Sequence, residues 1–179
     1  TAIIANRYVN YIHNSRLNPN KFYIGVSNGM LVAEYVSGEW LVSDNLKDFK
    51  EKVYSILELD KRNVWVGSEN TAYRILMDKN DFPIDIRAYP IKSDFTERIL
   101  VRNILGIPYF FLSTGLYSYN AEKDEVVYNT NTNKGFTGQS KYIFSLDNIT
   151  WVFNEYIWIS IHELTKYANL AESFLEVFN

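Results

Sequence analysis

Asn63-Val64-Trp65-Val66-Gly67-Ser68 decides the fold of this 179-residue chain, because similar stretches recur on both sides of it. Each copy is a short run of aromatic and β-branched residues next to turn residues, which is typical of a β-strand. The other copies are Lys21-Phe22-Tyr23-Ile24-Gly25, Pro108-Tyr109-Phe110-Phe111-Leu112 and Tyr156-Ile157-Trp158-Ile159-Ser160. The spacings are 42, 45 and 48 residues when the copies are aligned on Gly25, Gly67, Leu112 and Ser160. A period of this length with strand-like content indicates the blades of a β-propeller.

The composition favours pleated sheets and argues against two classes of partner. Aromatic residues make up 16% of the chain, whereas it has only 8 Gly and 4 Pro, a balance that suits half-buried strand surfaces. The formal net charge is −3 and the basic residues form no block, so we expect no nucleic-acid partner. Because no apolar run approaches the ~20 residues that cross a bilayer, we expect no membrane contact from this chain itself.

The chain has no cysteine. This excludes disulfides, thiolate metal ligands and a cysteine nucleophile, but it does not identify the compartment. The sequence begins Thr1-Ala2-Ile3-Ile4, with neither a methionine nor a leader peptide. We therefore expect a processed protein or an excised fragment.

Four repeat units follow from the pattern, at about 7–42, 50–90, 98–129 and 142–179. Each of the first three contains four apolar runs separated by turn residues, which predicts four antiparallel strands per unit. Ser27-Asn28-Gly29 and Ser113-Thr114-Gly115 occupy the same place in two of these units and predict tight hairpin turns. We expect an all-β, propeller-like array of about four four-stranded antiparallel blades, which would be a partial propeller.

One segment of the second unit also fits a helix. Within residues 50–59, Val53, Ile56 and Leu57 fall at helical spacing. Val53 to Ile56 nevertheless occupies the place of the first strand in the repeat. The register of the repeat therefore predicts a strand.

The fourth unit is the least regular. The polar interval from Asn129 to Asn148 predicts a long loop, because its first half has too few apolar residues for a core strand. Strands are predicted at 149–153, 156–161, 164–167 and 174–178. Residues 162–177 also fit an amphipathic helix, so both alternatives stay open there.

The repeat resembles the two-component regulator propeller repeat. The best match is Val53-Tyr54-Ser55-Ile56-Leu57-Glu58-Leu59-Asp60 followed by Asn63 to Ser68, and Ser113-Thr114-Gly115-Leu116-Tyr117-Ser118-Tyr119-Asn120 matches the third strand of that repeat. Ser145-Leu146-Asp147-Asn148-Ile149 resembles the approach to the innermost strand. The chain departs from the pattern where Asn70-Thr71, Leu112 and Ser160 replace expected glycines.

The resemblance implies a ligand-binding sensor region in the periplasm, the extracytoplasmic part of a membrane-anchored hybrid histidine kinase or related regulator. Such regions are often tied to polysaccharide use. Their rings usually carry more blades than four, so the resemblance implies an open arc. Its exposed edge strands would pair with the remaining blades or with a second copy of the chain.

Catalytic and metal-binding signatures are absent from the sequence. The two histidines, His13 and His162, fall in different units, and the acidic residues cluster at predicted hairpin tips without the spacing of a calcium loop. No serine lies in a nucleophile motif, and no paired carboxylates suggest glycoside hydrolysis. We expect no cofactor, no metal and no enzymatic activity.

Two groups of residues are candidates for binding. The aromatic residues of the repeated stretch, Tyr23, Trp65, Phe110 and Trp158, could stack on sugars, but their repeated position favours packing between blades. Polar residues of the innermost strands would face a central channel, and the predicted ligand-binding residues are Asn10, His13, Tyr54, Arg102 and Trp151. Arg102 interrupts an apolar run, where it would hold a carboxylate or sugar hydroxyls. Its alternative partner is an acidic residue of a neighbouring blade.

The sequence thus predicts a non-catalytic propeller fragment that senses a small molecule or an oligosaccharide. The alternative is a scaffold for protein–protein interaction or dimerisation.

Overall fold

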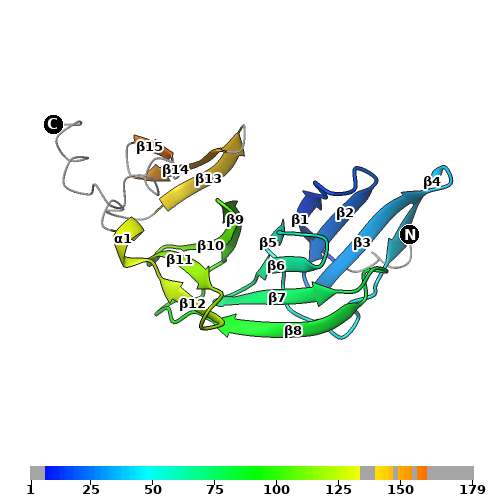
Figure 1. Cartoon of the computed structure of the whole chain (residues 1–179), viewed down its shortest axis with the longest axis horizontal. Helices are drawn as coiled ribbons and strands as arrows, with labels where there is room; N and C mark the ends of the chain where they lie inside the picture. Colours follow the sequence, from blue (N-terminus) through cyan, green and yellow to red (C-terminus); the bar gives the residue numbers. More distant parts are fainter. Residues whose placement is uncertain (1–6, 134–139, 147–148, 155–156, 161–179) are drawn as a thin grey trace. The chain divides into compact units, whose positions relative to one another are not determined.

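The computed structural model describes residues 7–133, 140–146, 149–154 and 157–160, and beyond residue 133 it describes the backbone alone. The chain divides into two compact units, Thr1–Val101 and Arg102–Asn179, each of which is treated by itself. All the long elements are β-strands (Figure 1). Within the described residues, no helix is long and apolar enough to cross a membrane.

The strands form antiparallel sheets in which each strand pairs with its neighbours in sequence. The first blade contains β1 (Val9–Asn14), β2 (Lys21–Val26), β3 (Gly29–Val36) and β4 (Glu39–Ser43). The second contains β5 (Ser55–Glu58), β6 (Asn63–Gly67), β7 (Thr71–Met77) and β8 (Pro83–Pro90). The third contains β9 (Leu100–Ile104), β10 (Ile107–Leu112), β11 (Gly115–Asn120) and β12 (Glu125–Tyr128). A short helix, α1 (Thr130–Asn133), precedes β13 (Ser140–Leu146), β14 (Ile149–Asn154) and β15 (Ile157–Ser160). The all-β array of blades predicted from the repeat is confirmed.

The two hairpin turns predicted at Ser27-Asn28-Gly29 and Ser113-Thr114-Gly115 are also confirmed. Val26 pairs with Gly29 and Leu112 pairs with Gly115, so each hairpin closes with a two-residue loop. The φ angles of the two glycines are +133° and +132°. These are values that side chains disfavour, which is why glycine ends both turns.

Residues 55–58 are a strand, so the helical alternative for this segment is wrong. All four side chains of β5 are buried. A helix there would present part of its circumference to solvent, whereas an inner strand of a blade is covered on both faces. Tertiary burial therefore decides the conformation of this segment.

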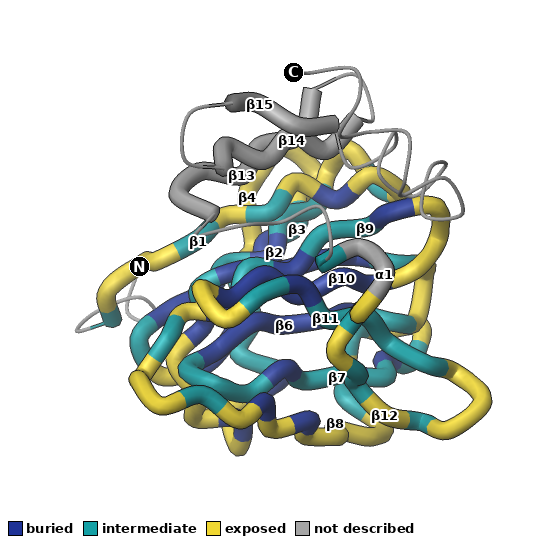
Figure 2. The backbone as a smooth tube through the Cα atoms, turned by 90° about the vertical axis from the view of Figure 1, so that its left-hand side faces the viewer, coloured by how far each residue is buried: buried dark blue, intermediate teal, exposed yellow. Residues whose placement is uncertain are grey.

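The core of the first unit lies between its two blades. It combines side chains from β2, β3, β5, β6 and β7 with the segment that links the blades: Tyr23, Met30, Val32, Leu46, Phe49, Val53, Ile56, Val64, Val66, Ile75 and Met77. Figure 2 shows burial along the middle strands and exposure along outer strands and turns. Tyr23, Trp65 and Phe110 are at most 2% exposed, and Tyr23 packs in the core between the first two blades. The side chain of Trp158 lies outside the described residues.

The fourth repeat unit requires a correction. Strand β13 occupies part of the interval from Asn129 to Asn148 that was expected to be a loop, because its aromatic and β-branched run pairs with β14. The segment predicted as the first strand, 149–153, is therefore second in the order β13-β14-β15, and 156–161 is third. The spacing from Leu112 to Asn154 is 42 residues, as it is from Gly25 to Gly67. Residues 164–167 and 174–178 lie outside the described residues.

Candidate functional site

The structure places three of the predicted binding residues in the first unit. Asn10 and His13 are in β1, where Asn10 is exposed and His13 is half-buried. Tyr54 directly precedes β5 and is also half-buried, and its backbone N–H donates to the carbonyl oxygen of Gly67 at 2.9 Å. Asn10 and His13 are thus in the first strand of their blade, whereas Tyr54 lies just outside the first strand of its blade.

The other two predicted residues belong to the second unit. Arg102 is half-buried in β9, the first strand of the third blade. Trp151 is in β14, so its expected place on an innermost strand is wrong, and its side chain is not described. Because the two units are described separately, convergence of the five residues on one site remains a prediction.

Tyr54 takes part in a charged surface cluster. Its hydroxyl donates to Glu69 Oε1 at 2.8 Å, and Lys52 Nζ lies 3.0 Å from the same oxygen. These two hydrogen bonds lower the pKa of the Glu69 carboxyl. The guanidinium of Arg98 lies 4.7 Å from the centre of the Tyr54 ring, within the range of a cation–π contact. The hydroxyl of Tyr54 is therefore committed to Glu69.

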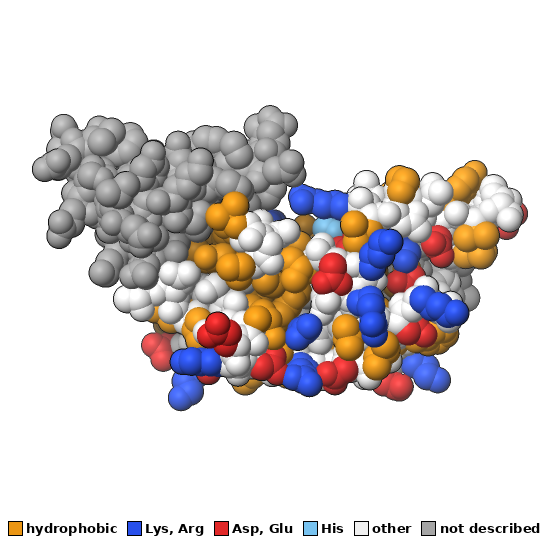
Figure 3. Space-filling view, viewed as in Figure 1, with side chains coloured by type: hydrophobic (Ala, Val, Ile, Leu, Met, Phe, Trp, Pro, Cys, Tyr) orange, Lys and Arg blue, Asp and Glu red, His pale blue; other side chains and the backbone are white. Residues whose placement is uncertain are grey.

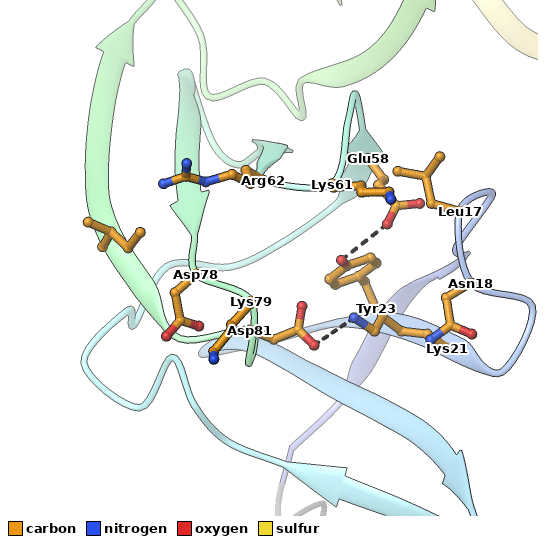
Figure 4. A pocket seen from close by; sticks show the side chains of 11 residues that line it. Leu17, Asn18, Lys21, Tyr23, Glu58, Lys61, Arg62, Asp78, Lys79 and Asp81 are labelled. Carbon is orange, nitrogen blue, oxygen red and sulfur yellow. Dashed lines mark hydrogen bonds and ion pairs between the residues drawn. The ribbon is translucent and has the colours of Figure 1, made fainter.

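Sequence reasoning missed a pocket at the junction of the first two blades, which we name the blade-junction pocket. It has a volume of about 540 Å³, within the usual range for small-molecule sites. Its lining comes from the β1–β2 loop and β2, from the end of β5 and the β5–β6 loop, and from the β7–β8 turn and the start of β8 (Figure 4). The lining residues are Leu17, Asn18, Lys21, Tyr23, Glu58, Lys61, Arg62, Asp78, Lys79, Asp81 and Ile84.

Glu58, at the end of β5, is a buried carboxylate and only 7% exposed. It accepts hydrogen bonds from the Ser15 hydroxyl at 2.8 and 2.9 Å and from the Arg16 backbone N–H at 2.9 Å. The Tyr23 hydroxyl donates a further bond at 3.3 Å. These donors replace the water that the carboxylate loses on burial. They also join the first blade to the second.

An ion pair lies beside this carboxylate. Lys21 Nζ is 2.6 Å from Asp81 Oδ2, and each side chain is only 14% exposed. Lys21 comes from β2 and Asp81 from the β7–β8 turn, so this pair also bridges the two blades. Figure 4 shows both bridges lying next to each other in the pocket.

Burial, followed by the charges of Glu58 and Asp81, raises the pKa of Tyr23 above its ordinary value. The phenol is therefore neutral at physiological pH and serves as a hydrogen-bond donor.

The pocket has the chemistry of a binding site. It presents hydroxyl, carboxylate, ammonium and guanidinium groups. Among the described residues, no group of three or more His, Cys, Asp or Glu side chains is placed to hold a metal ion. Its lining residues come from three stretches that are far apart in sequence, 17–23, 58–62 and 78–84. Only the repeat register, combined with the loop lengths, could have indicated that these loops meet.

Comparison with known proteins identifies the fold. Neither a protein-family model nor a curated protein sequence matches the chain. The solved extracellular domain of the hybrid two-component system BT3049 from B. thetaiotaomicron matches 87% of this chain with a TM-score of 0.59 and 14% identity. The extracellular domain of BT4673 from the same organism is described as a one-component system in one crystal structure and as a hybrid two-component system in another. Each of the two matches 85% of this chain, with TM-scores of 0.54 and 0.52 and identities of 16% and 18%.

The chain spans 21% of the length of each of these structures. At such low identity, the similarity establishes the fold alone. The chain has the blade architecture of part of these extracellular sensor domains, in agreement with the resemblance of its repeats.

Proposed function

We propose that the chain is part of the extracytoplasmic sensor region of a two-component signal-transduction protein, located in the periplasm, and that it binds a ligand without catalysis. The observation that carries this proposal is the match of its blades, over most of its length, to extracellular domains described as parts of hybrid two-component systems. The repeats support the same assignment independently, since their resemblance to the regulator propeller repeat comes from sequence alone.

The ligand that we propose is a small molecule, in particular an oligosaccharide. Two places offer polar groups to it: the predicted residues of the innermost strands, and the blade-junction pocket. Only the pocket is assembled within one unit of the structure.

A glycan array followed by calorimetric titration of hits tests this proposal. We expect saturable binding of at least one saccharide, with no turnover of that saccharide on prolonged incubation. Failure to bind any saccharide would contradict the oligosaccharide part of the proposal. Hydrolysis or elimination of a bound glycan would contradict the non-catalytic part.

A second function, association with another sheet, is favoured by the outer face of the first blade. Phe22 and Tyr35 stand 42 residues before Val64 and Met77, which the second blade buries against the first. Met77 is 1% exposed but Tyr35 is 42% exposed. The face of the first blade that corresponds to a buried blade interface is thus only partly covered.

Aromatic side chains gather on this face. The ring of Trp40 lies 5.0 Å from that of Phe22 and 5.3 Å from that of Tyr35, measured between ring centres. Figure 3 shows hydrophobic side chains at the tip of the β3–β4 hairpin, to which Tyr35 and Trp40 belong. The proposed occupant is a further blade-type sheet, from the remaining blades or from a second copy of the chain.

A further inference from the structure

The blade-junction pocket carries unpaired positive charge. Lys61 and Arg62 come from the β5–β6 loop and Lys79 from the β7–β8 turn, and all three are exposed. Within the described residues, none of the three forms an ion pair. Figure 3 shows basic side chains interspersed with acidic ones over β3 and the β7–β8 turn. The three cations are exposed, and the carboxylates near them are not in ion-pair contact with them in the described part of the chain.

Each acidic group of the pocket already has partners other than these three cations. Asp81 is paired with Lys21, and Glu58 is buried and bound by three donors from the first blade. Asp78 Oδ1 accepts the backbone N–H groups of Asn80 and Phe82, each at 2.8 Å, and so holds the turn. Four cationic side chains and three carboxylates line the pocket, so its formal charge is +1 in a chain whose net charge is −3.

Arg62 is the best-positioned of the three cations. Its Nε donates to the backbone carbonyl of Met77 at 3.4 Å, and Met77 N donates to the carbonyl of Arg62 at 2.7 Å. These contacts tie the residue to the end of β7. A guanidinium held through Nε keeps its two terminal nitrogens available for a carboxylate or a sulfate, which it can bind in a bidentate manner.

The walls of the pocket also include aliphatic surface. Leu17, from the β1–β2 loop, is 50% exposed, and Ile84, in β8, is 55% exposed. Exposed aliphatic side chains beside hydrogen-bonding groups suit a saccharide, whose rings present both C–H surface and hydroxyls. The buried Tyr23 lies deeper in the same pocket.

We propose that the blade-junction pocket binds an acidic saccharide, with its carboxylate or sulfate at Arg62 and its flanking lysines. The sugar ring lies against Leu17 and Ile84. This inference rests on the proposed saccharide-sensing function and adds to it the site and the charge of the ligand. Binding there would stabilise the junction of the two blades, because the lining comes from both.

Calorimetric titration of the 179-residue chain with cellobiouronic acid and with cellobiose tests the inference, since these probes differ in one carboxylate. We expect the acidic disaccharide to bind about tenfold more tightly than the neutral one, as a charge-assisted hydrogen bond would provide. Added salt should reduce that difference. Inorganic sulfate is titrated as well, and we expect it to bind more weakly than the acidic disaccharide, because it makes no contact with the aliphatic walls.

The variant Arg62→Ala should remove the preference for the acidic disaccharide, whereas Lys123→Ala, an exposed lysine of the β11–β12 turn, should leave it unchanged. Equal affinity for the two disaccharides, or a preference that survives Arg62→Ala, would overturn the inference while leaving saccharide sensing intact. Sulfate binding as tight as that of the acidic disaccharide would show an anion site without saccharide recognition. Failure of every saccharide on the array to bind would instead contradict the oligosaccharide part of the proposed function, on which this inference rests.

Discussion

Gly67 in β6 lies so close to the carbonyl oxygen of Ile99, just before β9, that no side chain fits between them. Gly25 holds the equivalent place in β2, where an added Cβ would come within 2.5 Å of Val53 Cγ1. Each approach is accompanied by the same backbone bond, from Val53 N to Val26 O at 3.1 Å and from Ile99 N to Ser68 O at 3.0 Å. The glycines of the repeat therefore mark where the chain entering the next blade crosses the previous one.

Gly67→Ala should destabilise the protein strongly, because the new methyl group meets backbone that cannot rotate away. We expect a loss of about 3 kcal/mol in the free energy of unfolding, at the upper end of overpacking effects. Urea unfolding measures it. Gly38→Ala is the matched control: Gly38 has a φ of +94° but no atom within 4 Å of an added Cβ, so only about 1 kcal/mol of backbone strain is expected. Equal losses in the two variants would contradict the proposed role of Gly67.

Ser55→Ala should loosen the same crossing. The hydroxyl of Ser55 donates to Ile99 O at 2.7 Å and accepts from Val101 N at 2.9 Å, and its side chain is completely buried. Its removal takes away two hydrogen bonds to buried backbone groups, and we expect a loss of about 2 kcal/mol in unfolding free energy. Ser43→Ala is the control, since the half-exposed Ser43 makes one 3.3 Å bond to Val32 O. If Ser55→Ala lost no more unfolding free energy than Ser43→Ala, the result would contradict a stabilising role for the Ser55 hydroxyl at this crossing.

Most of the blade architecture could be predicted because the repeat constrains it several times over. Gly25 and Gly67 lie at equivalent chain crossings in two blades, and Gly29 and Gly115 end equivalent hairpin turns. Residues 55–58, whose local pattern is compatible with a helix, were assigned correctly because the register outweighed local spacing. The fourth unit lacks such glycines. Its pattern therefore predicts a loop where β13 lies, and the predicted strand order is shifted by one strand.

The candidate site was far less predictable. A pocket forms where loops of different blades meet, and its lining depends on loop conformation and not on strand periodicity. Lys21 and Asp81 are 60 residues apart in sequence, and no residue pattern in either segment predicts that the two side chains meet. Turn residues such as Asp78 to Asp81 were correctly expected at a hairpin tip. Their contact with the first blade could be known only from the fold.

Stability should fall at alkaline pH, and Tyr23 should account for part of the fall. Its pKa in the folded protein is raised above the ordinary 10.0, so the folded state keeps a proton that the unfolded state releases. The stabilisation is complete below pH 10 and is lost as the pH rises towards the folded pKa. Denaturant midpoints at pH 8 to 11 should therefore decline less in Tyr23→Phe than in the parent.

The same variant should lose about 1 kcal/mol at pH 7, because it removes one hydrogen bond to Glu58. Tyr8→Phe is a suitable control, since Tyr8 is 80% exposed. If the denaturant midpoints of the parent and of Tyr23→Phe fell equally between pH 8 and 11, the raised pKa of Tyr23 would not contribute to the pH dependence of stability.

The exposed aromatic face of the first blade should drive self-association. We expect light scattering at micromolar concentration to show a dimer or larger species, and Trp40→Ser to shift it towards the monomer. The reason is that Trp40, which is 48% exposed, contacts both other rings of the cluster. Phe95→Ser is the matched control, because Phe95 is 74% exposed but lies in the loop before β9. A parent chain that is monomeric at these concentrations would exclude a second copy of the chain as the partner of this surface.

Arg102→Ala tests the ligand-binding residues that sequence reasoning selected, as distinct from the blade-junction pocket. If the ligand lies along the innermost strands, its affinity should fall about tenfold in Arg102→Ala, the loss expected for one charge-assisted contact. The same ligand should bind normally to Arg62→Ala. The urea midpoint should be measured alongside, because Arg102 is half-buried in β9 and its loss could weaken the third blade. Unchanged affinity with an unchanged midpoint would remove Arg102 from the site. An affinity that falls only in Arg62→Ala would place recognition at the junction of the first two blades, where lysine, arginine and buried tyrosine already converge.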